Sequence, residues 1–183
     1  MARIYTKTGD DGTTALLYGG RASKSDDVVE VFGDIDEAVA ALGIARANGS
    51  DQPLADLLLR IQRELFVVAA DLAANPRQRH RLEPGKSQVT AEMVDGLEQD
   101  IDAFVAQYPL RPVFVIPGST PNEAAIDFAR TVTRRAERHV VRARAAGHEV
   151  SSDVVRYLNR LSDLLYVLAR RAAGTGNEPA SHD

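Results

Sequence analysis

The segment YTKTGDDGTT, residues 5–14, combines residue types that suit an anion-binding loop. Its glycines let backbone N–H groups approach an anion closely, its threonine hydroxyls can donate to phosphate oxygens, and Lys7 supplies positive charge. The same letters also fit a plain hairpin, because GDDG is ordinary turn chemistry. The segment is not a Walker loop, and the similar PGKS at residues 84–87 has His80 where that motif requires its first glycine. A phosphate-binding loop and a simple hairpin therefore remain as alternatives.

A second group of candidates is the run of arginines in residues 130–146, which hold six arginines against one acid, Glu137. Three of them are spaced i, i+4 and i+8 and so share one face of a helix: Arg130, Arg134 and Arg138. Like charges at this spacing destabilise a helix by about 0.2–0.5 kcal/mol per pair. A solvated face eased by neighbouring acids is one interpretation. A bound polyanion is the other, because planar guanidinium groups suit bidentate phosphate contacts.

Polar residues on two further predicted helices could complete such a site. Asn159 lies beside Leu158 at the edge of an apolar seam, where its amide could reach a ligand. Three carboxylates lie among the apolar residues of the first predicted helix: Asp34, Asp36 and Glu37. A carboxylate there could pair with one of the surplus arginines and tie the two helices together, within one subunit or between two.

The remaining residue types favour binding over nucleophilic attack. The sequence has no Glu-x-x-His motif, which argues against a di-iron site in a helical bundle. Its four histidines show no i,i+3 or i,i+4 pairing, which argues against zinc, and the absence of cysteine removes a thiol nucleophile. We therefore expect the nucleophile of any reaction to arrive with a second substrate.

The elements that must position these residues are helices. Apolar residues recur at alternating spacings of four and three in five segments, and TPNE at residues 120–123 is a capping box. The predicted helices run from Val28 to just before Gly49, and over Leu54–Leu72, Val94–Tyr108, Thr120–Gly147 and Ser152–Gly174. Seams that repeat every 3.5 residues or so predict an all-α, five-helix up-and-down bundle.

Four segments fall outside the predicted helices. Residues 1–25 form an N-terminal binding loop, and the bundle occupies residues 26–174 of one domain. The polar connection at residues 75–88 is longer than bundles usually tolerate and is expected to be functional or mobile. A short extended piece is predicted at residues 113–116, and residues 175–183 are predicted to be a disordered tail.

Composition narrows the possible partners. A chain of 183 residues is most simply one domain, and a net charge of −4 argues against nonspecific nucleic-acid binding. MARIYTKTGD contains no apolar signal-peptide core, and the longest apolar stretch, LFVVAADLAA, is too short to span a bilayer. The sequence therefore predicts a cytoplasmic protein that binds neither nucleic acid nor membrane.

Five motifs in order resemble the ATP:cob(I)alamin adenosyltransferases of the PduO type: YTKTGDDGTT, GDIDEA, FVIPGST, RTVTRRAER and YLNRLSD. The resemblance covers about residues 3–174. It implies a homotrimer of five-helix bundles with an active site at each subunit interface. It also implies transfer of the 5′-deoxyadenosyl group of ATP to the cobalt of cobalamin, with release of triphosphate and assistance from Mg²⁺ carried mainly by the ATP phosphates.

The resemblance also implies roles for individual residues. Those matching ATP-binding positions are Thr6, Lys7, Thr8, Gly9, Thr14, Lys24, Arg134, Arg135, Glu137, Arg138 and Asn159. Asp36 and Arg130 match a pair that bridges two subunits. Phe114 matches a phenylalanine that presses on the lower face of the corrin, although from VFVIP alone we would expect it to be an ordinary core residue.

Two other function classes compete with the enzyme. A non-catalytic sensor or chaperone on the same fold would bind ATP or adenosylcobalamin and pass it to a client. A plain helical interaction protein would present its arginine face to an acidic partner. The enzyme would further require a cobalamin reductase and an adenosylcobalamin-dependent acceptor as partners.

Overall fold

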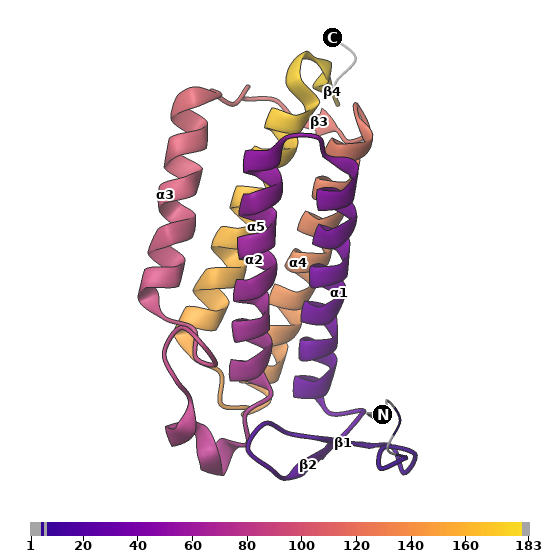
Figure 1. Ribbon diagram of the computed structural model, residues 1–183, viewed down its shortest axis with the longest axis vertical. Coiled ribbons are helices and arrows are strands. Elements are labelled where there is room, and N and C mark those ends of the chain that lie inside the picture. The colour runs from indigo at the N-terminus through magenta and orange to yellow at the C-terminus, as the bar shows by residue number, and fades with distance from the viewer. Residues whose placement is uncertain (1–4, 6, 181–183) are drawn as a thin grey trace.

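The computed structural model describes residue 5 and residues 7–180, and these form an all-α bundle, as predicted (Figure 1). The five long helices are α1 (Asp27–Asn48), α2 (Gln52–Leu72), α3 (Ala91–Gln107), α4 (Pro121–Ala145) and α5 (Ser152–Ala173). Successive helices alternate in direction, so the chain goes up and down along one long axis (Figure 1). Within the described chain, no helix is apolar enough over a sufficient length to cross a membrane.

Side-chain caps explain where most helices begin. The carboxylate of Asp26 accepts from the N–H of Val28 at 2.9 Å, and the hydroxyl of Thr120 accepts from the N–H of Glu123 at 3.0 Å. Asp51 and Ser151 cap α2 and α5 in the same way. Each cap satisfies an N–H group that has no partner inside its helix.

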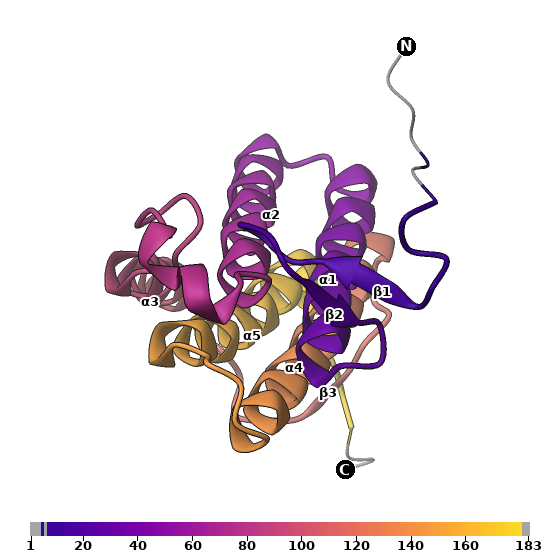
Figure 2. The same ribbon diagram turned by 90° about the horizontal axis from the view of Figure 1, so that it is seen from below.

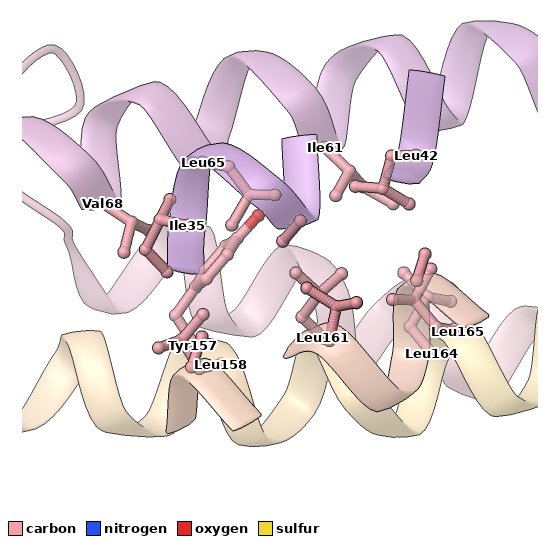
Figure 3. Close-up of a cluster of buried hydrophobic side chains, with 14 of the residues drawn as sticks. Ile35, Leu42, Ile61, Leu65, Val68, Tyr157, Leu158, Leu161, Leu164 and Leu165 are labelled. Carbon is pink, nitrogen blue, oxygen red and sulfur yellow. The ribbon is translucent and has the colours of Figure 1, made fainter. Parts of the chain in front are cut away.

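The helices form a curved row in the order α2, α1, α4, α5, α3 (Figure 2). Aliphatic side chains of α1, α2 and α5 meet in the centre around Leu65 and Leu161 (Figure 3). Tyr157 is fully buried among them, and its hydroxyl donates to the carboxylate of Glu64 at 2.7 Å. Burial, together with the negative Glu64, raises the pKa of Tyr157 well above its ordinary value, so the phenol stays a donor.

The N-terminal segment forms a turn followed by a hairpin, and phosphate binding by this segment stays a prediction. GDDG forms a turn, and the hairpin of β1 (Thr13–Ala15) and β2 (Arg21–Ser23) follows it. The tip of the hairpin is fixed to the lower end of α2, because Leu17 donates to the carbonyl of Ala73 at 2.8 Å and accepts from the N–H of Asn75 at 3.0 Å.

The predicted loop at residues 75–88 is ordered around the 3₁₀ helix η1 (Pro76–Arg81). Asp71 is buried and organises the start and end of this connection: its carboxylate pairs with Arg79 at 2.5 Å and accepts from the N–H of Val89 at 2.9 Å. The guanidinium of Arg81 also lies over the ring of Tyr18 in the hairpin, 4.5 Å from its centroid. The connection is therefore a support for the hairpin.

The structure differs from the prediction of disorder for residues 175–183. A short 3₁₀ helix, η2 (Gly174–Gly176), precedes β4 (Glu178–Pro179), which pairs antiparallel with β3 (Val115–Ile116). The physical reason is that two distant segments pair through their backbones. A strand of two residues is too short for its sequence to predict such pairing. Residues 181–183 lie outside the described residues.

Candidate active site

A groove runs across the outer face of α5, with α3 and α4 as its walls. It encloses a cavity of about 740 Å³. Its lining residues come from the three helices and the segment after α3: Glu98, Ile101, Asp102, Val105, Leu110, Arg130, Arg134, Arg160, Ser162, Asp163, Tyr166 and Val167. A volume of this size fits a nucleotide-sized ligand.

The predicted arginine row lies along the α4 wall, but its members differ in pairing. Arg130 donates to the carboxylate of Asp127 at 2.5 Å. Arg134 and Arg138 are exposed, and Arg138 donates to the backbone carbonyl of Arg134 at 3.0 Å. Over the described part of the chain, neither guanidinium lies within ion-pair distance of a carboxylate. These two cations are therefore available to an external anion.

Asn159 is held in one orientation by charged neighbours on α4 and α5. Its amide nitrogen donates to Glu137 of α4 at 3.0 Å, and its amide oxygen accepts from Arg160 at 2.7 Å. Arg160 in turn donates to Glu98 of α3 at 2.7 Å. Sequence analysis did not predict the roles of Arg160 and Glu98; the placement of Arg160 directly after Asn159 in NRLSD was the available signal.

Asp163 brings a carboxyl group into the same groove. Partial burial raises the pKa of this carboxyl above its ordinary range, with nearby Glu137 acting in the same direction, while Arg160 and Arg134 oppose the shift. The groove therefore disfavours negative charge at Asp163 even beside two arginines.

On the opposite side of α4, basic side chains pair with carboxylates of α1. Arg135 lies on this side, with its Nε 3.1 Å from the carboxylate of Asp34 and a second bond to Glu37. These two carboxylates raise the pKa of the Arg135 guanidinium. His139 also contacts Asp34, with 2.5 Å between Nδ1 and the nearer oxygen. The predicted tie between the first and fourth helices is therefore present within one chain, and Arg135 does not face the groove.

The Asp36–Arg130 pair predicted by resemblance does not form within the chain. Asp36 is exposed, and Arg130 is paired with Asp127 on its own helix. Because the prediction concerns two subunits, it stays a prediction.

The N-terminal candidates are arranged around the turn that precedes β1. The ammonium of Lys24 donates to the carbonyl of Gly9 at 2.9 Å, and a side chain at Gly9 would place its Cβ 3.3 Å from that ammonium. Lys7 is exposed, with a positive φ of 59°. Thr8 and Thr14 lie before and within the hairpin, while the prediction for Thr6 falls outside the described residues.

Arg21 is the residue that holds this turn together, and sequence analysis missed it. Its guanidinium donates to the hydroxyl of Thr13 at 2.7 Å and to the carbonyl of Thr8. The carboxylate of Asp11 accepts from the N–H of Thr13 at 3.0 Å. The sequence offered no specific signal for Arg21 beyond its charge.

The two halves of the predicted ATP site lie apart in the single chain. The turn at residues 7–12 extends beyond α1, on the far side of that helix from α5 (Figure 2). The contacts described for the turn come from the hairpin and Lys24, whereas those of the Asn159 side chain come from α4 and α5.

Phe114 is not a core residue. Its side chain is 89% exposed and borders a second cavity of about 650 Å³, which is also lined by Val113, Ala180 and Tyr166. Tyr166 lines the arginine groove as well, so the two cavities adjoin. An exposed aromatic ring beside a cavity is a feature of binding surfaces rather than of packing.

The sequence profile of the cobalamin adenosyltransferase family matches residues 4–172. The chain therefore belongs to the cobalamin adenosyltransferase family. A corrinoid adenosyltransferase from Mycobacterium leprae is 42% identical over 182 residues, covering 97% of this chain and 94% of the relative. Another from Bacillus subtilis is 43% identical, covering 92% of this chain and 85% of the relative.

A solved structure agrees with the fold in detail. A variant PduO-type ATP:corrinoid adenosyltransferase from Lactobacillus reuteri, complexed with cobalamin and ATP, superimposes with a TM-score of 0.85 at 31% identity. The match covers 97% of this chain and 95% of that one. The predicted family, bundle fold and adenosyltransferase class are confirmed.

Proposed function

We propose that this chain transfers the 5′-deoxyadenosyl group of ATP to the cobalt of cob(I)alamin, forming adenosylcobalamin and releasing triphosphate. The observation that carries the proposal is the exposed side chain of Arg134 lining a cavity of about 740 Å³, with exposed Arg138 one turn further along α4, in a chain of this family. Relatives named corrinoid adenosyltransferases at about this length support it.

The transfer is a displacement at C5′ of ATP. The electron pair of cobalt(I) forms the cobalt–carbon bond, and the C5′–O bond breaks with its electron pair going to triphosphate. Because the nucleophile belongs to the corrinoid, the protein has to align the two substrates and neutralise the leaving group. Arg134 and Arg138 would donate to the triphosphate, and Glu137 and Arg160 would hold the Asn159 amide toward the nucleotide.

Phe114 would serve the corrinoid rather than ATP. We propose that its exposed ring covers the lower face of the corrin and keeps the lower ligand away from cobalt. A cobalt without that ligand is easier to reduce to the nucleophilic cobalt(I) state. The cavity beside Phe114 adjoins the arginine groove through Tyr166, which is the arrangement that two reacting substrates require.

The separation of the two half-sites supports a site shared between subunits. We propose a homotrimer in which the N-terminal turn of one subunit closes over the groove of the next. Thr6, Lys7, Thr8, Gly9, Thr14 and Lys24 would then contact the ATP that Arg134 and Arg138 bind. We assign Arg135 to the contact between α1 and α4, because its guanidinium is already engaged there.

Asp36 would pair with Arg130 across this interface. We expect Asp36→Asn to weaken both assembly and corrinoid affinity, because the variant loses a charged partner between subunits. Size-exclusion elution over a dilution series and a corrinoid titration measure the two effects. Glu37→Gln is the matched control, since the partner of Glu37 is Arg135 of the same chain. An Asp36→Asn protein that elutes like the unmodified protein at every dilution would contradict the pairing.

Mg²⁺ would enter with ATP. Among the described residues, no group of three histidine, cysteine, aspartate or glutamate side chains could hold a metal ion. Mg²⁺ is usually bound by substrate phosphates together with one or two carboxylates, so the ATP phosphates would be its main ligands. A cytoplasmic location, a cobalamin reductase and an adenosylcobalamin-dependent acceptor enzyme are further proposals that follow from the resemblance.

The deciding experiment is anaerobic incubation of the protein with ATP and chemically reduced cobalamin. We expect the absorption spectrum to change to that of the cobalt–carbon product, with triphosphate released in equal amount. Omission of ATP is the control. Tight binding of both ligands without product would instead favour the non-catalytic sensor or chaperone.

A further inference from the structure

A cluster of four charged side chains lies between the arginine groove and the segment that carries Phe114. Arg170 of α5 is 7% exposed, and its guanidinium lies 2.5 Å from the carboxylate of Glu123 and 2.6 Å from that of Asp127. Glu123 is fully buried. Asp127 also pairs with Arg130 at 2.5 Å, so two positive and two negative charges balance within the cluster.

Glu123 holds the turn that follows β3. Its second carboxylate oxygen accepts from the N–H of Gly118 at 2.6 Å and from the N–H of Ser119 at 3.0 Å. The capping box predicted for TPNE would direct this carboxylate to the N–H of Thr120. The observed bonds reach one and two residues further back, which fixes the backbone between Phe114 and α4.

The same cluster holds the segment on the other side of Phe114. Arg170 donates to the side-chain oxygen of Asn177 at 3.3 Å, and the Asn177 amide donates back to the carbonyl of Arg170 at 3.2 Å. The N–H of Ala180 then donates to the carbonyl of Phe114 at 2.8 Å. Both backbone supports of Phe114 therefore lead to Arg170.

Such a cluster is a poor way to gain stability. Removing charges from water is costly, and a buried ion pair often contributes no more than apolar residues of the same volume. Within the described structure, the Nε of Arg170 is also buried without a hydrogen-bond partner. A role in fixing one conformation explains the cluster better than a role in stability.

We infer that Glu123 and Arg170 are positioning residues that set the place of the Phe114 ring relative to the arginine groove. The inference rests on the proposed function. Glu123 acts through the backbone of Gly118 and Ser119, Arg170 acts through the C-terminal segment, and Asp127 connects both to Arg130 at the groove. Their combined effect is to fix the distance between the corrinoid wall and the nucleotide site.

Two variants test this inference. Glu123→Gln keeps the shape of the side chain and removes one buried charge. The double variant Glu123→Ala with Arg170→Met removes one charge of each sign, so the remaining pair of Asp127 and Arg130 stays balanced and the fold is preserved. We expect kcat/KM for the corrinoid to fall about tenfold in both variants, corresponding to one misplaced apolar contact. The KM for ATP should stay within about twofold, a change too small to indicate a lost phosphate contact.

Glu64→Gln is the matched control, because Glu64 is a partly buried carboxylate that binds Tyr157 in the centre of the bundle. A general loss of stability would affect all three proteins alike, whereas misplacement of Phe114 affects only the two cluster variants. Electron paramagnetic resonance of bound cob(II)alamin gives a second measurement. The fraction of cobalt without its lower ligand should fall in the cluster variants and stay unchanged in Glu64→Gln.

Amide hydrogen exchange tests the geometry without any reaction. Gly118, Ser119 and Ala180 should lose protection in the double variant and keep it in Glu64→Gln. Normal corrinoid kinetics, an unchanged cobalt spectrum or unchanged protection in a folded double variant would overturn the inference. An unmodified protein that forms no cobalt–carbon product would overturn the proposed function instead, and the exchange experiment would still decide whether the cluster holds the Phe114 segment.

Discussion

The two sides of α4 both carry arginines, but these arginines differ in whether a carboxylate pairs with them. Toward α1, Arg135 and Arg142 are engaged by carboxylates, and His139 contacts Asp34. Toward the groove, Arg134 and Arg138 are exposed and have no carboxylate within ion-pair distance in the described structure. The difference shows that an arginine's surroundings, and not its presence in a motif, decide whether its guanidinium is already paired or available to a ligand.

The largest effect should come from the groove side. We expect Arg134→Ala to reduce turnover about 100-fold or more while the protein stays folded, because one preorganised donor to the leaving triphosphate is lost. Steady-state kinetics with saturating corrinoid measure this loss. Arg144→Ala, an exposed arginine in the last turn of the same helix, is the control and should change turnover little. Near-normal turnover of Arg134→Ala would contradict the proposal that the groove side of α4 binds the triphosphate.

Phe114 extends the comparison to apolar residues. We expect Phe114→Ala to lower kcat/KM for the corrinoid about tenfold, the equivalent of losing one buried aromatic contact. Because the ring is 89% exposed in the free chain, the free energy of unfolding should not change. Exposed Phe66 on α2 offers a control, and Phe66→Ala should leave both quantities unaltered. A marked loss of stability in Phe114→Ala would indicate that Phe114 is a core residue after all.

The α1 side should respond in stability and not in catalysis. We expect Arg135→Met to lower the free energy of unfolding by about 1–3 kcal/mol, because the buried carboxylate of Asp34 loses a charged hydrogen bond. Urea denaturation measures this change. Turnover of the folded variant should stay within about twofold of the unmodified protein. Loss of a contact to the transition state would reduce turnover by much more. A large loss of turnover at unchanged stability would place Arg135 among the ligand-binding residues.

The smallest effect concerns pH and Asp163. Burial raises the pKa of this carboxyl in the folded state, so its ionised form opposes folding at neutral pH. Because Asp163 is exposed and solvent screens its charge, Asp163→Asn should be only slightly more stable than the unmodified protein at pH 8, within about 0.5 kcal/mol. The advantage should shrink as the pH falls through the raised pKa toward the ordinary value of about 3.9. Thermal unfolding across this range measures it, and an advantage that grows at low pH would contradict the shift.

The helices could be predicted because their information is local. Caps such as Thr120 and the repeating apolar seams specify each helix from neighbouring residues, and residue type and spacing pointed to Arg134, which lines the groove. The sequence did not separate Arg134 from Arg135, although consecutive helical residues differ in direction by about 100°. Only the packing of α1 against α4 decides which of two adjacent arginines meets Asp34.

The remaining features depend on contacts between distant segments. Arg160 contacts Glu98, and β4 pairs with β3, at sequence separations of 62 or more. Two-residue strands are too short to show a periodic pattern. The sequence around a surface arginine does not indicate which carboxylate it will contact. The buried Glu123–Arg170 pair was missed for the same reason, because the sequence suggested only a capping role for Glu123.

The anchoring of the hairpin tip to the end of α2 limits how far the N-terminal turn can travel. From the hairpin at Thr13 back to Lys7 the chain has six residues, which extend over about 20 Å at most. In the proposed assembly, this short connection lets the turn reach only the groove of the adjoining subunit. A ring of subunits then contains as many complete catalytic centres as it has members, and an isolated subunit contains none.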